Sequence, residues 1–362
     1  EELHLTATVV TYSTLVSACE KGKQWRWAFE LLGRMSQHLV QPNVVTYGAV
    51  ISACEKAPQW QRALLVLVEM RRAQVHPSTI CCNAAISGCE KGAEVTVALQ
   101  LFDEMCSFGP RPDVVTFNAL ISCCEKARSW QKALSLLEML HQIKLTPDTV
   151  TYNAALSACE KGHQWHWAFH LLKMMPKVSL RPDVVSLNAS ISACEKTSHW
   201  QRAIDLLLHT SRQLHLKVNI ISFNAAIAAC ENSHRWREAL ELYAKAGRGG
   251  ISPTWSTFVV TVAACSQGRQ WEIAVMLKEN ALQLLGTEFN PDAALAVFNA
   301  VISGCEKARH WTLALQQLED LRRISCEANV ITYSALISAC EKSQRWEAAL
   351  QLWEDLHGDS VR

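Results

Sequence analysis

A short motif that ends in cysteine recurs at a nearly constant interval along this chain. The first six copies are 35 residues apart, and the next four follow at intervals of 36, 35, 40 and 35 residues. The recurring cysteines are Cys19, Cys54, Cys89, Cys124, Cys159, Cys194, Cys230, Cys265, Cys305 and Cys340. A period of this length indicates an array of stacked supersecondary units, which grows by addition and has no single core.

Counting each unit from ten residues before its cysteine gives ten repeats. Seven of them fill residues 9–254, with starts at Val9, Val44, Thr79, Val114, Thr149, Val184 and Ile220. Residues 255–294 form a longer, irregular repeat, and two further repeats occupy residues 295–362, the last of them truncated. Residues 1–8 match the end of a repeat, so we expect a truncated repeat there and a longer array.

Each unit has the pattern of two helices joined by a short turn. In the fifth repeat Tyr152, Leu156 and Cys159 are spaced by four and three residues, which places them on one helical face. A second segment with the same kind of spacing begins at Trp165, and Gly162 lies where a first helix would end. We therefore predict an all-α, right-handed α-solenoid superhelix of about ten 35-residue helix-turn-helix hairpins.

Four irregularities interrupt the array. The third repeat has Val95 where the others have tryptophan, and the sixth repeat is one residue longer than the rest. The seventh repeat ends in a glycine-rich segment at 247–250, and the eighth is five residues too long near 286–294. We expect a bend or a lost binding position at these places.

Composition and motifs exclude several functional classes. The net charge is +1, so the chain lacks the strong positive charge that many nucleic-acid-binding proteins carry. No run of 18 or more apolar residues is present, so no membrane partner is expected. The sequence contains no H-E-x-x-H, G-x-x-x-x-G-K-[ST], G-x-S-x-G or G-x-G-x-x-G motif, so we predict a protein that is not an enzyme and needs no cofactor.

The cysteines and tryptophans are best explained by packing. No C-x-x-C pair occurs, and helices ~8–10 Å apart cannot be joined by a disulfide, so the cysteine row predicts small buried core residues and no metal. The tryptophans that open the second helices could stack nucleobases, but their apolar spacing favours packing between helices. His163, His166 and His170 share one predicted helical face, yet they occur in one repeat only and predict no metal site.

A polar face remains on each first helix. In the fifth repeat Val150, Asn153, Ser157 and Lys161 lie opposite the apolar stripe. The fifth residue of successive repeats is Ser13, Gly48, Asn83, Asn118, Asn153, Asn188, Asn224, Val259, Asn299 and Ser334. The same face ends in Lys21, Lys56, Lys91, Lys126, Lys161, Lys196, Lys307 and Lys342. These rows fit a polymer with one base and one phosphate per repeat, or equally a solvated face with ordinary helix-end lysines.

The motif V-V-T-Y-N-A-L-I-S-A-C-E-K, closed by P-D or P-N after 35 residues, resembles the pentatricopeptide repeat family, and its uniform length resembles the P type. The resemblance implies binding of single-stranded RNA at one base per repeat. It implies that the fifth and last residues select the base, so that the last-position partners are Asn43, Ser78, Asp113, Asp148, Asp183, Asn219, Thr254 and Asn329. It also implies that second residues sandwich the base, namely Val10, Val45, Ile80, Val115, Val150, Val185, Ile221 and Ile331, with Ser256 and Ala296 as exceptions.

The resemblance further implies a target and a setting. Repeats one to nine would read A-?-U-U-U-C-Y-?-C, and the lysine row would contact phosphates. The expected role is RNA processing, stabilisation or translation in a chloroplast or mitochondrion, with other processing or translation factors as further partners. The alternative is an α-solenoid scaffold for protein–protein interaction within a larger complex. A last residue of Asp, Asn or Ser is also a good helix N-cap, and both roles are compatible.

Overall fold

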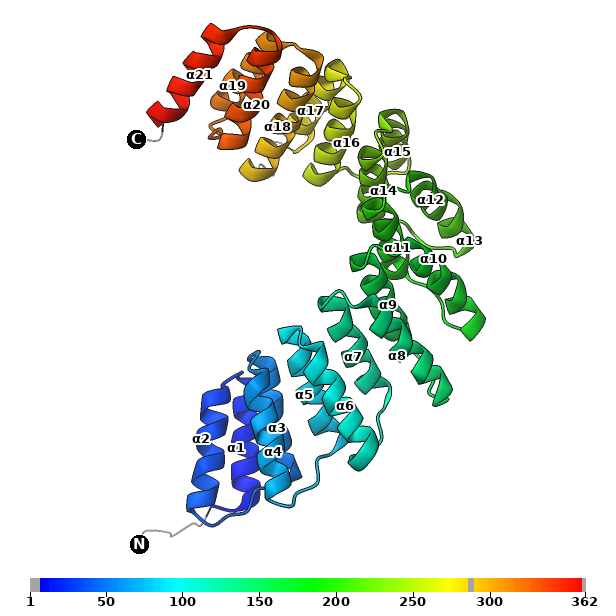
Figure 1. Cartoon of the computed structure of the whole chain (residues 1–362), viewed down its shortest axis with the longest axis vertical. Helices are drawn as coiled ribbons and strands as arrows, with labels where there is room; N and C mark the ends of the chain where they lie inside the picture. The colour runs from blue at the N-terminus through cyan, green and yellow to red at the C-terminus, as the bar shows by residue number, and fades with distance from the viewer. Residues whose placement is uncertain (1–6, 286–289, 360–362) are drawn as a thin grey trace. The chain divides into compact units, whose positions relative to one another are not determined.

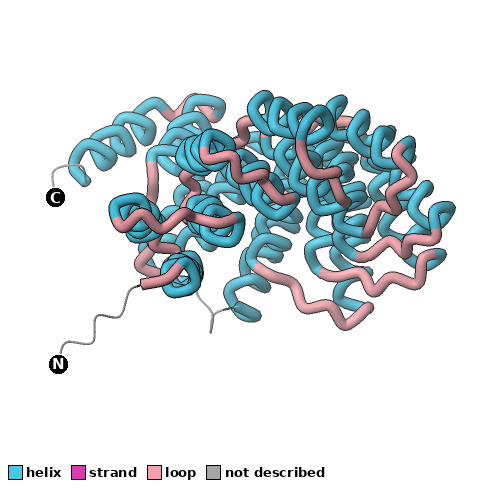
Figure 2. The backbone as a smooth tube through the Cα atoms, turned by 90° about the horizontal axis from the view of Figure 1, so that it is seen from below, coloured by secondary structure: helices cyan, strands magenta, loops and turns pink. Residues whose placement is uncertain are grey.

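The computed structural model describes residues 7–285 and 290–359, and within them it contains helices and no strand. Every repeat is a pair of helices joined by a short turn, and within each of two units the pairs stack in sequence order (Figures 1 and 2). The prediction of an all-α array of helical hairpins is confirmed. The expected repeat end at residues 1–8 lies, apart from its last two residues, outside the described part. The chain forms two compact units, Glu1–Arg181 and Pro182–Arg362.

The first helices of the repeats stack on one another within each unit. In the first unit they are α1 (Val9–Lys21), α3 (Val44–Lys56), α5 (Thr79–Gly92), α7 (Val114–Lys126) and α9 (Thr149–Lys161). In the second unit they are α11 (Val184–Lys196), α14 (Ile220–Asn232), α16 (Trp255–Gln267), α18 (Pro291–Ala308) and α20 (Val330–Lys342).

Within each unit, the second helices pack on the first helix of their own repeat and on that of the next repeat in the unit. They are α2 (Trp25–Gln37), α4 (Trp60–Arg72), α6 (Val95–Phe108), α8 (Trp130–Gln142) and α10 (Trp165–Met174), which continues into the 3-10 turn η1 (Met175–Val178). The second unit has α12 (Trp200–Asp205), η2 (Leu206–Thr210), α13 (Ser211–Gln213), α15 (Trp236–Arg248), α17 (Trp271–Leu285), α19 (Trp311–Arg323) and α21 (Trp346–Asp359). None of the helices in these described ranges is both long and apolar enough to cross a bilayer.

Most of the first helices begin where the sequence supplies a cap. Asp148 accepts a hydrogen bond of 2.8 Å from the Thr151 backbone N–H, as an N-cap residue does. Gly162 directly follows α9, as predicted, but its φ is an ordinary −84°, and the left-handed residue of the turn is His163, at φ 56°. The glycine therefore serves a purpose other than a left-handed backbone.

That purpose is the close approach of a tryptophan from the preceding repeat. A Cβ atom built on Gly162 would lie 2.4 Å from Cδ1 of Trp130, and one on Gly268 would lie 2.3 Å from the same atom of Trp236. Gly92 stands in the same relation to Trp60. The predicted role of the tryptophans in packing between helices is confirmed, because these rings fill the joint between one repeat and the next.

The first helices are buried on most of their circumference. The buried residues of α9 are Thr151, Tyr152, Ala154, Ala155, Leu156, Ala158 and Cys159. Many are small, which lets successive first helices approach closely. Val150, Asn153, Ser157 and Lys161 are outside this set, as the helical period predicts.

Extra residues are absorbed inside helices. The additional residue of the sixth repeat produces the π-helical turn η2 within the second helix, so α14 still begins at the expected Ile220. The insertion near 286–294 lengthens the flanking helices: α17 has 15 residues and α18 has 18. α18 starts at Pro291, four residues before the Leu295 at which the sequence pattern places the ninth repeat, while residues 286–289 lie outside the described part.

The glycine contacts make a prediction about stability. Gly162→Ala should destabilise the first unit by about 1–3 kcal/mol, because the new methyl group overlaps the Trp130 ring. Gly33→Ala is the matched control: it lies inside α2 with no atom within 4 Å of its built Cβ, so it should stabilise by roughly 0.8–1 kcal/mol. Urea unfolding followed by circular dichroism measures both changes, and equal effects of the two substitutions would contradict the packing role.

Candidate functional site

The second residue of most repeats is an exposed aliphatic side chain on a first helix. Val10, Val45, Ile80, Val115, Val150, Val185, Ile221 and Ile331 are between 57% and 73% exposed. Single exposed apolar residues are ordinary, but a row that recurs once per repeat on the same helical face is not a chance distribution. Ser256 is also exposed and Ala296 is partly buried.

A surface depression lies between two of these side chains, where α1 meets α3. Its volume is about 540 Å³. Val10 and Val45 line it together with Ser13, Asn43 and Lys21. The second, fifth and last residues that the sequence analysis singled out are therefore brought to one site in this pair of repeats, with the lysine at its margin.

The fifth and last residues of a repeat are hydrogen-bonded to each other and to the next repeat. Asn83 on α5 donates from Nδ2 to Oδ1 of Asp113 over 3.0 Å. The hydroxyl of Thr116, the third residue of the following repeat, donates to Asn83 Oδ1 over 2.6 Å. The same hydroxyl lies 2.9 Å from Asp113 Oδ1. We call these three residues, the fifth and last of one repeat and the third of the next, a reader trio.

The hydrogen bond from the third-position hydroxyl to the fifth-position amide oxygen recurs in other reader trios. Thr151 donates to Asn118 Oδ1 over 2.5 Å, and Asn118 donates to both carboxylate oxygens of Asp148 over 3.3 Å. Ser222 donates to Asn188 Oδ1 over 2.6 Å and Thr332 to Asn299 Oδ1 over 2.7 Å.

Three further trios depart from this arrangement. In the first repeat the hydroxyls of Ser13 and Thr46 are 2.8 Å apart. In the seventh, Asn224 Oδ1 is buried without a hydrogen-bond partner. The eighth has Val259 and Ala294 at the two positions, and Ala294 is fully buried inside α18.

The remaining predicted selecting residues lie as follows. Gly48 is beside Cys81, whose Sγ would be 3.3 Å from a Cβ at that glycine, and Ser78 caps α5. Asn153 is half-buried on α9 in the first unit, and Asp183 caps α11 in the second unit. Ser334 is exposed on α20. The last-position residues Asn43, Asp113, Asp148, Asp183, Asn219 and Asn329 all accept a hydrogen bond from the backbone at the start of the next helix.

Hydrogen bonding keeps the carboxylate of a reader trio charged. Burial alone would raise the pKa of Asp113, but the hydrogen bonds that it accepts from the Thr116 backbone and the Asn83 side chain outweigh burial. Its pKa is consequently below the ordinary value. The trio therefore presents a negatively charged acceptor at neutral pH.

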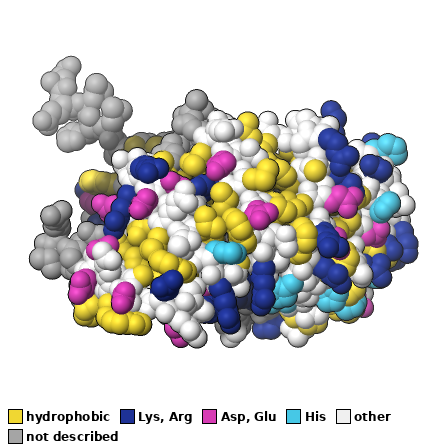
Figure 3. Space-filling view, turned by 90° about the horizontal axis from the view of Figure 1, so that it is seen from above, with side chains coloured by type: hydrophobic (Ala, Val, Ile, Leu, Met, Phe, Trp, Pro, Cys, Tyr) yellow, Lys and Arg dark blue, Asp and Glu magenta, His cyan; other side chains and the backbone are white. Residues whose placement is uncertain are grey.

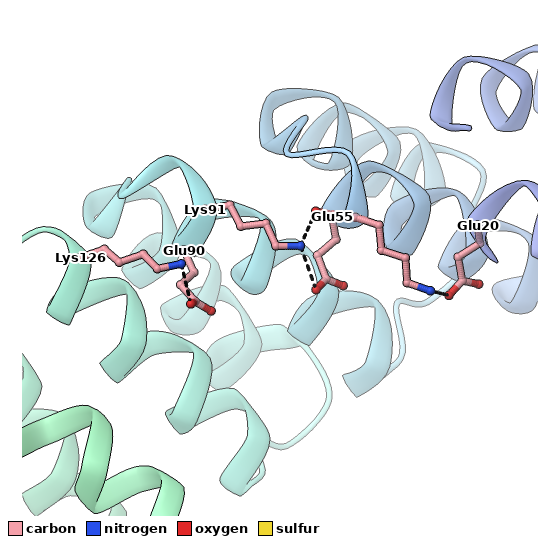
Figure 4. A network of polar contacts seen from close by, with 6 residues as sticks. Glu20, Glu55, Glu90, Lys91 and Lys126 are labelled. Atoms are coloured by element: carbon pink, nitrogen blue, oxygen red, sulfur yellow. Dashed lines mark hydrogen bonds and ion pairs between the residues drawn. The ribbon is translucent and has the colours of Figure 1, made fainter. Parts of the chain in front are cut away.

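The predicted cation row is part of an ion-pair ladder along the first helices. In several repeats the Glu that precedes the lysine pairs with the lysine of the next repeat, as in Lys56 with Glu20 at 2.8 Å and Lys126 with Glu90 at 2.9 Å (Figure 4). The pairs Lys91–Glu55, Lys161–Glu125 and Lys342–Glu306 follow the same rule. Lys21, in the first repeat, is exposed. On the face in Figure 3, acidic side chains are likewise scattered among basic ones.

The ion-pair ladder is interrupted in the seventh and eighth repeats. Asn232 and Gln267 replace lysine there, and Gln267 Nε2 reaches Glu231 only at 3.4 Å while its Oε1 is buried without a partner. Burial, with the negative charge of Glu195 added to it, raises the pKa of Glu231 to about 7, and Lys307 offsets part of the rise. This stretch of the ladder is therefore short of positive charge.

The cysteine row has the properties of a packing element. The recurring cysteines from the second repeat (Cys54) to the tenth (Cys340) are buried, and Cys19 in the first repeat is partly buried. Burial raises the pKa of Cys159 to about 12, so its thiol is protonated and unreactive at neutral pH. The predicted core role of these residues is confirmed.

The histidine prediction needs a correction. His163 lies in the left-handed turn before α10, so it does not share a helical face with His166 and His170. His166 stacks on Trp165 with ring centroids 3.6 Å apart. Among the residues that the structure describes, no three His, Cys, Asp or Glu side chains gather as a metal site.

The third residue of the repeat is the position that reading the sequence missed. It is a threonine or serine in eight of the ten repeats, and those at 46, 116, 151, 222 and 332 are fully buried. The recurrence was visible in the motif V-V-T-Y-N, but its partners belong to the preceding repeat and depend on how two helices are aligned.

The break in the ladder predicts a pH-dependent stability. A carboxyl group with a raised folded-state pKa contributes stability that is fully present below its unfolded pKa of ~4.3 and is lost as the pH rises through about 7. Glu231→Gln should therefore match the natural protein at pH 4 and exceed its stability at pH 8, by on the order of 1–2 kcal/mol after discounting for partial exposure. Urea unfolding at the two pH values measures this.

Glu90→Gln provides the control because Glu90 is paired with Lys126. It should lower stability slightly at pH 8, the opposite sign from Glu231→Gln. A stability difference for Glu231→Gln that is the same at both pH values would show that its carboxyl group is not the cause.

Known proteins share both the sequence pattern and the fold. Three family models match: the PPR repeat family at residues 7–56, 77–126 and 112–161, the pentatricopeptide repeat domain at 44–92 and 289–343, and the PPR repeat at 150–180, 221–251 and 331–361. Together they match well over half of the chain. No curated protein matches it in sequence.

Solved structures give the same answer for the fold. The crystal structure of the pentatricopeptide repeat protein PPR10 from maize is 21% identical, with a TM-score of 0.70 over 98% of this chain and 50% of that one. The structure of PPR10 in complex with an 18-nt psaJ RNA element is 20% identical, with a TM-score of 0.79 over 100% of this chain and 52% of that one. This chain thus spans about half the length of those proteins. On its repeats and its fold, it belongs to the pentatricopeptide repeat family.

Proposed function

We propose that this chain binds single-stranded RNA in a sequence-specific way, with one base held per repeat. The observation that carries the proposal is the depression between α1 and α3, which Val10, Val45, Ser13 and Asn43 line together. Two aliphatic walls and two hydrogen-bonding groups are what a flat, polar-edged nucleobase requires. A lysine at the margin suits the adjoining phosphate.

The exposed second residues support the sandwich. A Val or Ile that stays more than half exposed gains roughly 25 cal/mol for each Å² that a base removes from water. Successive repeats place one such side chain on each side of a base, so a single strand can enter between them. A peptide ligand would have no reason to match a strictly repeated aliphatic wall of this kind.

The reader trios support the choice of base. With Asn83 Oδ1 and Asp113 Oδ1 engaged by Thr116, the trio offers one amide N–H and the second carboxylate oxygen. A carboxylate acceptor suits the N3–H donor of uracil. In the trio of Asn188, Asn219 and Ser222, the Oδ1 atoms of both asparagines accept from Ser222, which leaves amide donors. Cytosine has an acceptor at N3, so exchanging Asp for Asn exchanges U for C.

Applied to the whole array, this reading gives A-?-U-U-U-C-Y-?-C for repeats one to nine. The second repeat has Gly48 and the eighth has Val259, so neither offers a side-chain hydrogen bond at the fifth position. The bound form of maize PPR10, which carries an 18-nt RNA element on the same fold, adds support. The uniform repeat length favours a P-type protein, which acts by binding rather than catalysis.

The proposed biological role is RNA processing, stabilisation or translation in a chloroplast or mitochondrion, with processing or translation factors as further partners. A bound array would cover its target strand and keep it single-stranded. The setting rests on the resemblance to the family.

Selection from a random pool of single-stranded RNA tests the function. The natural chain should enrich three consecutive U residues followed by C, because Asn83, Asn118 and Asn153 are combined with aspartates and Asn188 with Asn219. Sequencing of the retained RNA measures the enrichment. Failure to enrich any sequence at low salt, where phosphate contacts are strongest, would refute the proposal.

A double substitution serves as the matched control. Asn118→Ser combined with Asp148→Asn gives the fourth repeat the Ser–Asn pair of the first one, with Ser13 and Asn43. The middle U of the run should become A while the flanking bases stay unchanged. A change at every position would mean that the substitutions had altered the fold of the whole array rather than base selection in the fourth repeat.

The ion-pair ladder gives a separate prediction for phosphate contacts. Lys126→Gln should weaken RNA binding about equally for all sequences and reduce the slope of log Kd against log salt by about 0.7. Glu90→Gln, which frees the same lysine from its partner, should strengthen binding. Fluorescence anisotropy across a salt series measures both. An unchanged slope for Lys126→Gln would show that this lysine does not contact an RNA phosphate.

A further inference from the structure

The buried hydroxyl at the third position is at the centre of each regular reader trio. Thr116, Thr151, Ser222 and Thr332 have no exposed surface, and each donates to the amide oxygen of the fifth residue of the preceding repeat at 2.5–2.7 Å. The hydroxyl is too deep to touch a base in the groove. Any effect on base choice must act through the asparagine.

Counting protons shows what the hydroxyl fixes. Thr116 Oγ1 accepts the backbone N–H of Asp113 at 3.1 Å, so its one proton points toward the oxygens of Asn83 and Asp113. A carboxylate can only accept, so Asn83 must turn Nδ2 toward Asp113. The amide is thus held at both ends, and a flip would leave Asn83 Oδ1 facing the carboxylate and Nδ2 facing the hydroxyl.

The repeats of this one chain vary together in the way that such a role requires. Where the fifth residue is Gly48, the third residue of the next repeat is Cys81, and where it is Val259, that residue is Val297. These are the two repeats in which there is no amide or hydroxyl at the fifth position to orient.

Helix capping alone does not explain this pattern. A third-position hydroxyl also bonds to the N-cap backbone, as in the capping box of α9. However, α5 begins at Thr79 with Ser78 as its cap and Cys81 at the third position, so a repeat helix forms without that hydroxyl. The presence of a third-position hydroxyl therefore correlates with an amide or hydroxyl at the fifth position of the preceding repeat better than with the need for a helix cap.

We propose that the third-position hydroxyl of each repeat is a positioning residue for base selection in the preceding repeat. By fixing the amide orientation of the fifth residue, it determines which edge of the asparagine meets the base, so that three residues set the selectivity rather than two. This inference rests on the proposed RNA-binding function.

The seventh repeat is the natural exception. The hydroxyl of Thr257 lies 3.1 Å from that of Thr254, its own N-cap residue, and Asn224 Oδ1 is left buried without a partner. The amide of Asn224 is not held from both ends, so this repeat discriminates poorly between C and U.

Substitution of Thr151 in the full 362-residue chain tests the inference. Binding is measured to two RNAs that differ only in U or C opposite the fourth repeat, where Asn118 and Asp148 read the base. The natural chain should prefer U by about tenfold, Thr151→Val should reduce this preference to about twofold, and Thr151→Ser should retain it because serine keeps the hydroxyl. The preference at the third repeat, read by Asn83 and Asp113, should not change in either variant.

A gain of selectivity excludes a merely structural explanation. Thr254→Asn builds around Asn224 the arrangement of Asn188, Asn219 and Ser222, with Thr257 supplying the hydroxyl. It should raise the preference for C over U at the seventh repeat about fivefold or more, and adding Thr257→Val to it should abolish that gain. A gain that survives Thr257→Val would come from the last-position asparagine alone and would contradict the positioning role.

The outcomes separate the two proposals. If the natural chain prefers U at the fourth repeat and Thr151→Val preserves that preference in a folded protein, the positioning role is wrong and the RNA-binding function stands. If the natural chain shows no base preference at any repeat, the proposed function fails and the positioning role fails with it. Circular dichroism of each variant establishes that it is folded, and the comparison of Thr254→Asn with and without Thr257→Val decides the matter should Thr151→Val unfold.

Discussion

The close stacking of first helices is the constraint on which the other features of this structure depend. Within each unit, an internal first helix lies between two others and also contacts second helices, so most of its side chains must be small or apolar. α7 illustrates this with an alanine, two cysteines, a leucine and an isoleucine in its buried set. The first, second, fifth, ninth, twelfth and thirteenth residues of α7 and α9 escape burial in the core. Function on these helices is therefore confined to one narrow stripe, whatever ligand the array binds.

Close stacking also has a polar consequence. The start of each first helix is pressed against its neighbour, so its N-terminal N–H groups and capping side chain must find partners inside the protein. Asp148 and Thr151 satisfy that need within their own helix and at the same time bond to Asn118 of the preceding repeat. The groups that close one repeat onto the next are thus the groups that present hydrogen bonds to the groove. Under the proposed function, stability and selectivity therefore depend on the same residues.

The sequence predicts everything that depends on one helix alone. The period of 3.6 residues places Val150, Asn153, Ser157 and Lys161 on one face, and the structure has them there. Contacts between repeats could not be predicted, because they require the alignment of successive helices. From the sequence alone, Lys126 is an ordinary helix-end lysine and Gly162 an ordinary residue after a helix. The structure shows that Lys126 pairs with Glu90 of the preceding repeat and that Gly162 leaves room for Trp130 of the preceding repeat.

Insertions illustrate the same limit. A 36-residue repeat predicts a longer loop as readily as it predicts a π-helical turn, and only packing decides between them. Because Trp200 and Ile220 must both keep their places in the joints between repeats, the extra residue is absorbed in η2, between them.

The seventh and eighth repeats show that the packing core of a repeat can be kept while residues on its exposed stripe and margin change. Their core is intact: Phe258, Val262 and Cys265 belong to one apolar cluster that continues to Tyr333 and Leu352. The changes fall on the exposed stripe and its margin, where Ser256, Val259, Asn232 and Gln267 replace the usual residues. Under the proposed function, a bound strand would still need these repeats as spacers, since removing them would shift every later base by two positions. Selection for spacing alone would keep the buried positions and relax the exposed ones, which is the pattern of the eighth repeat with Ser256 and Val259, whereas the seventh repeat keeps Ile221 and Asn224.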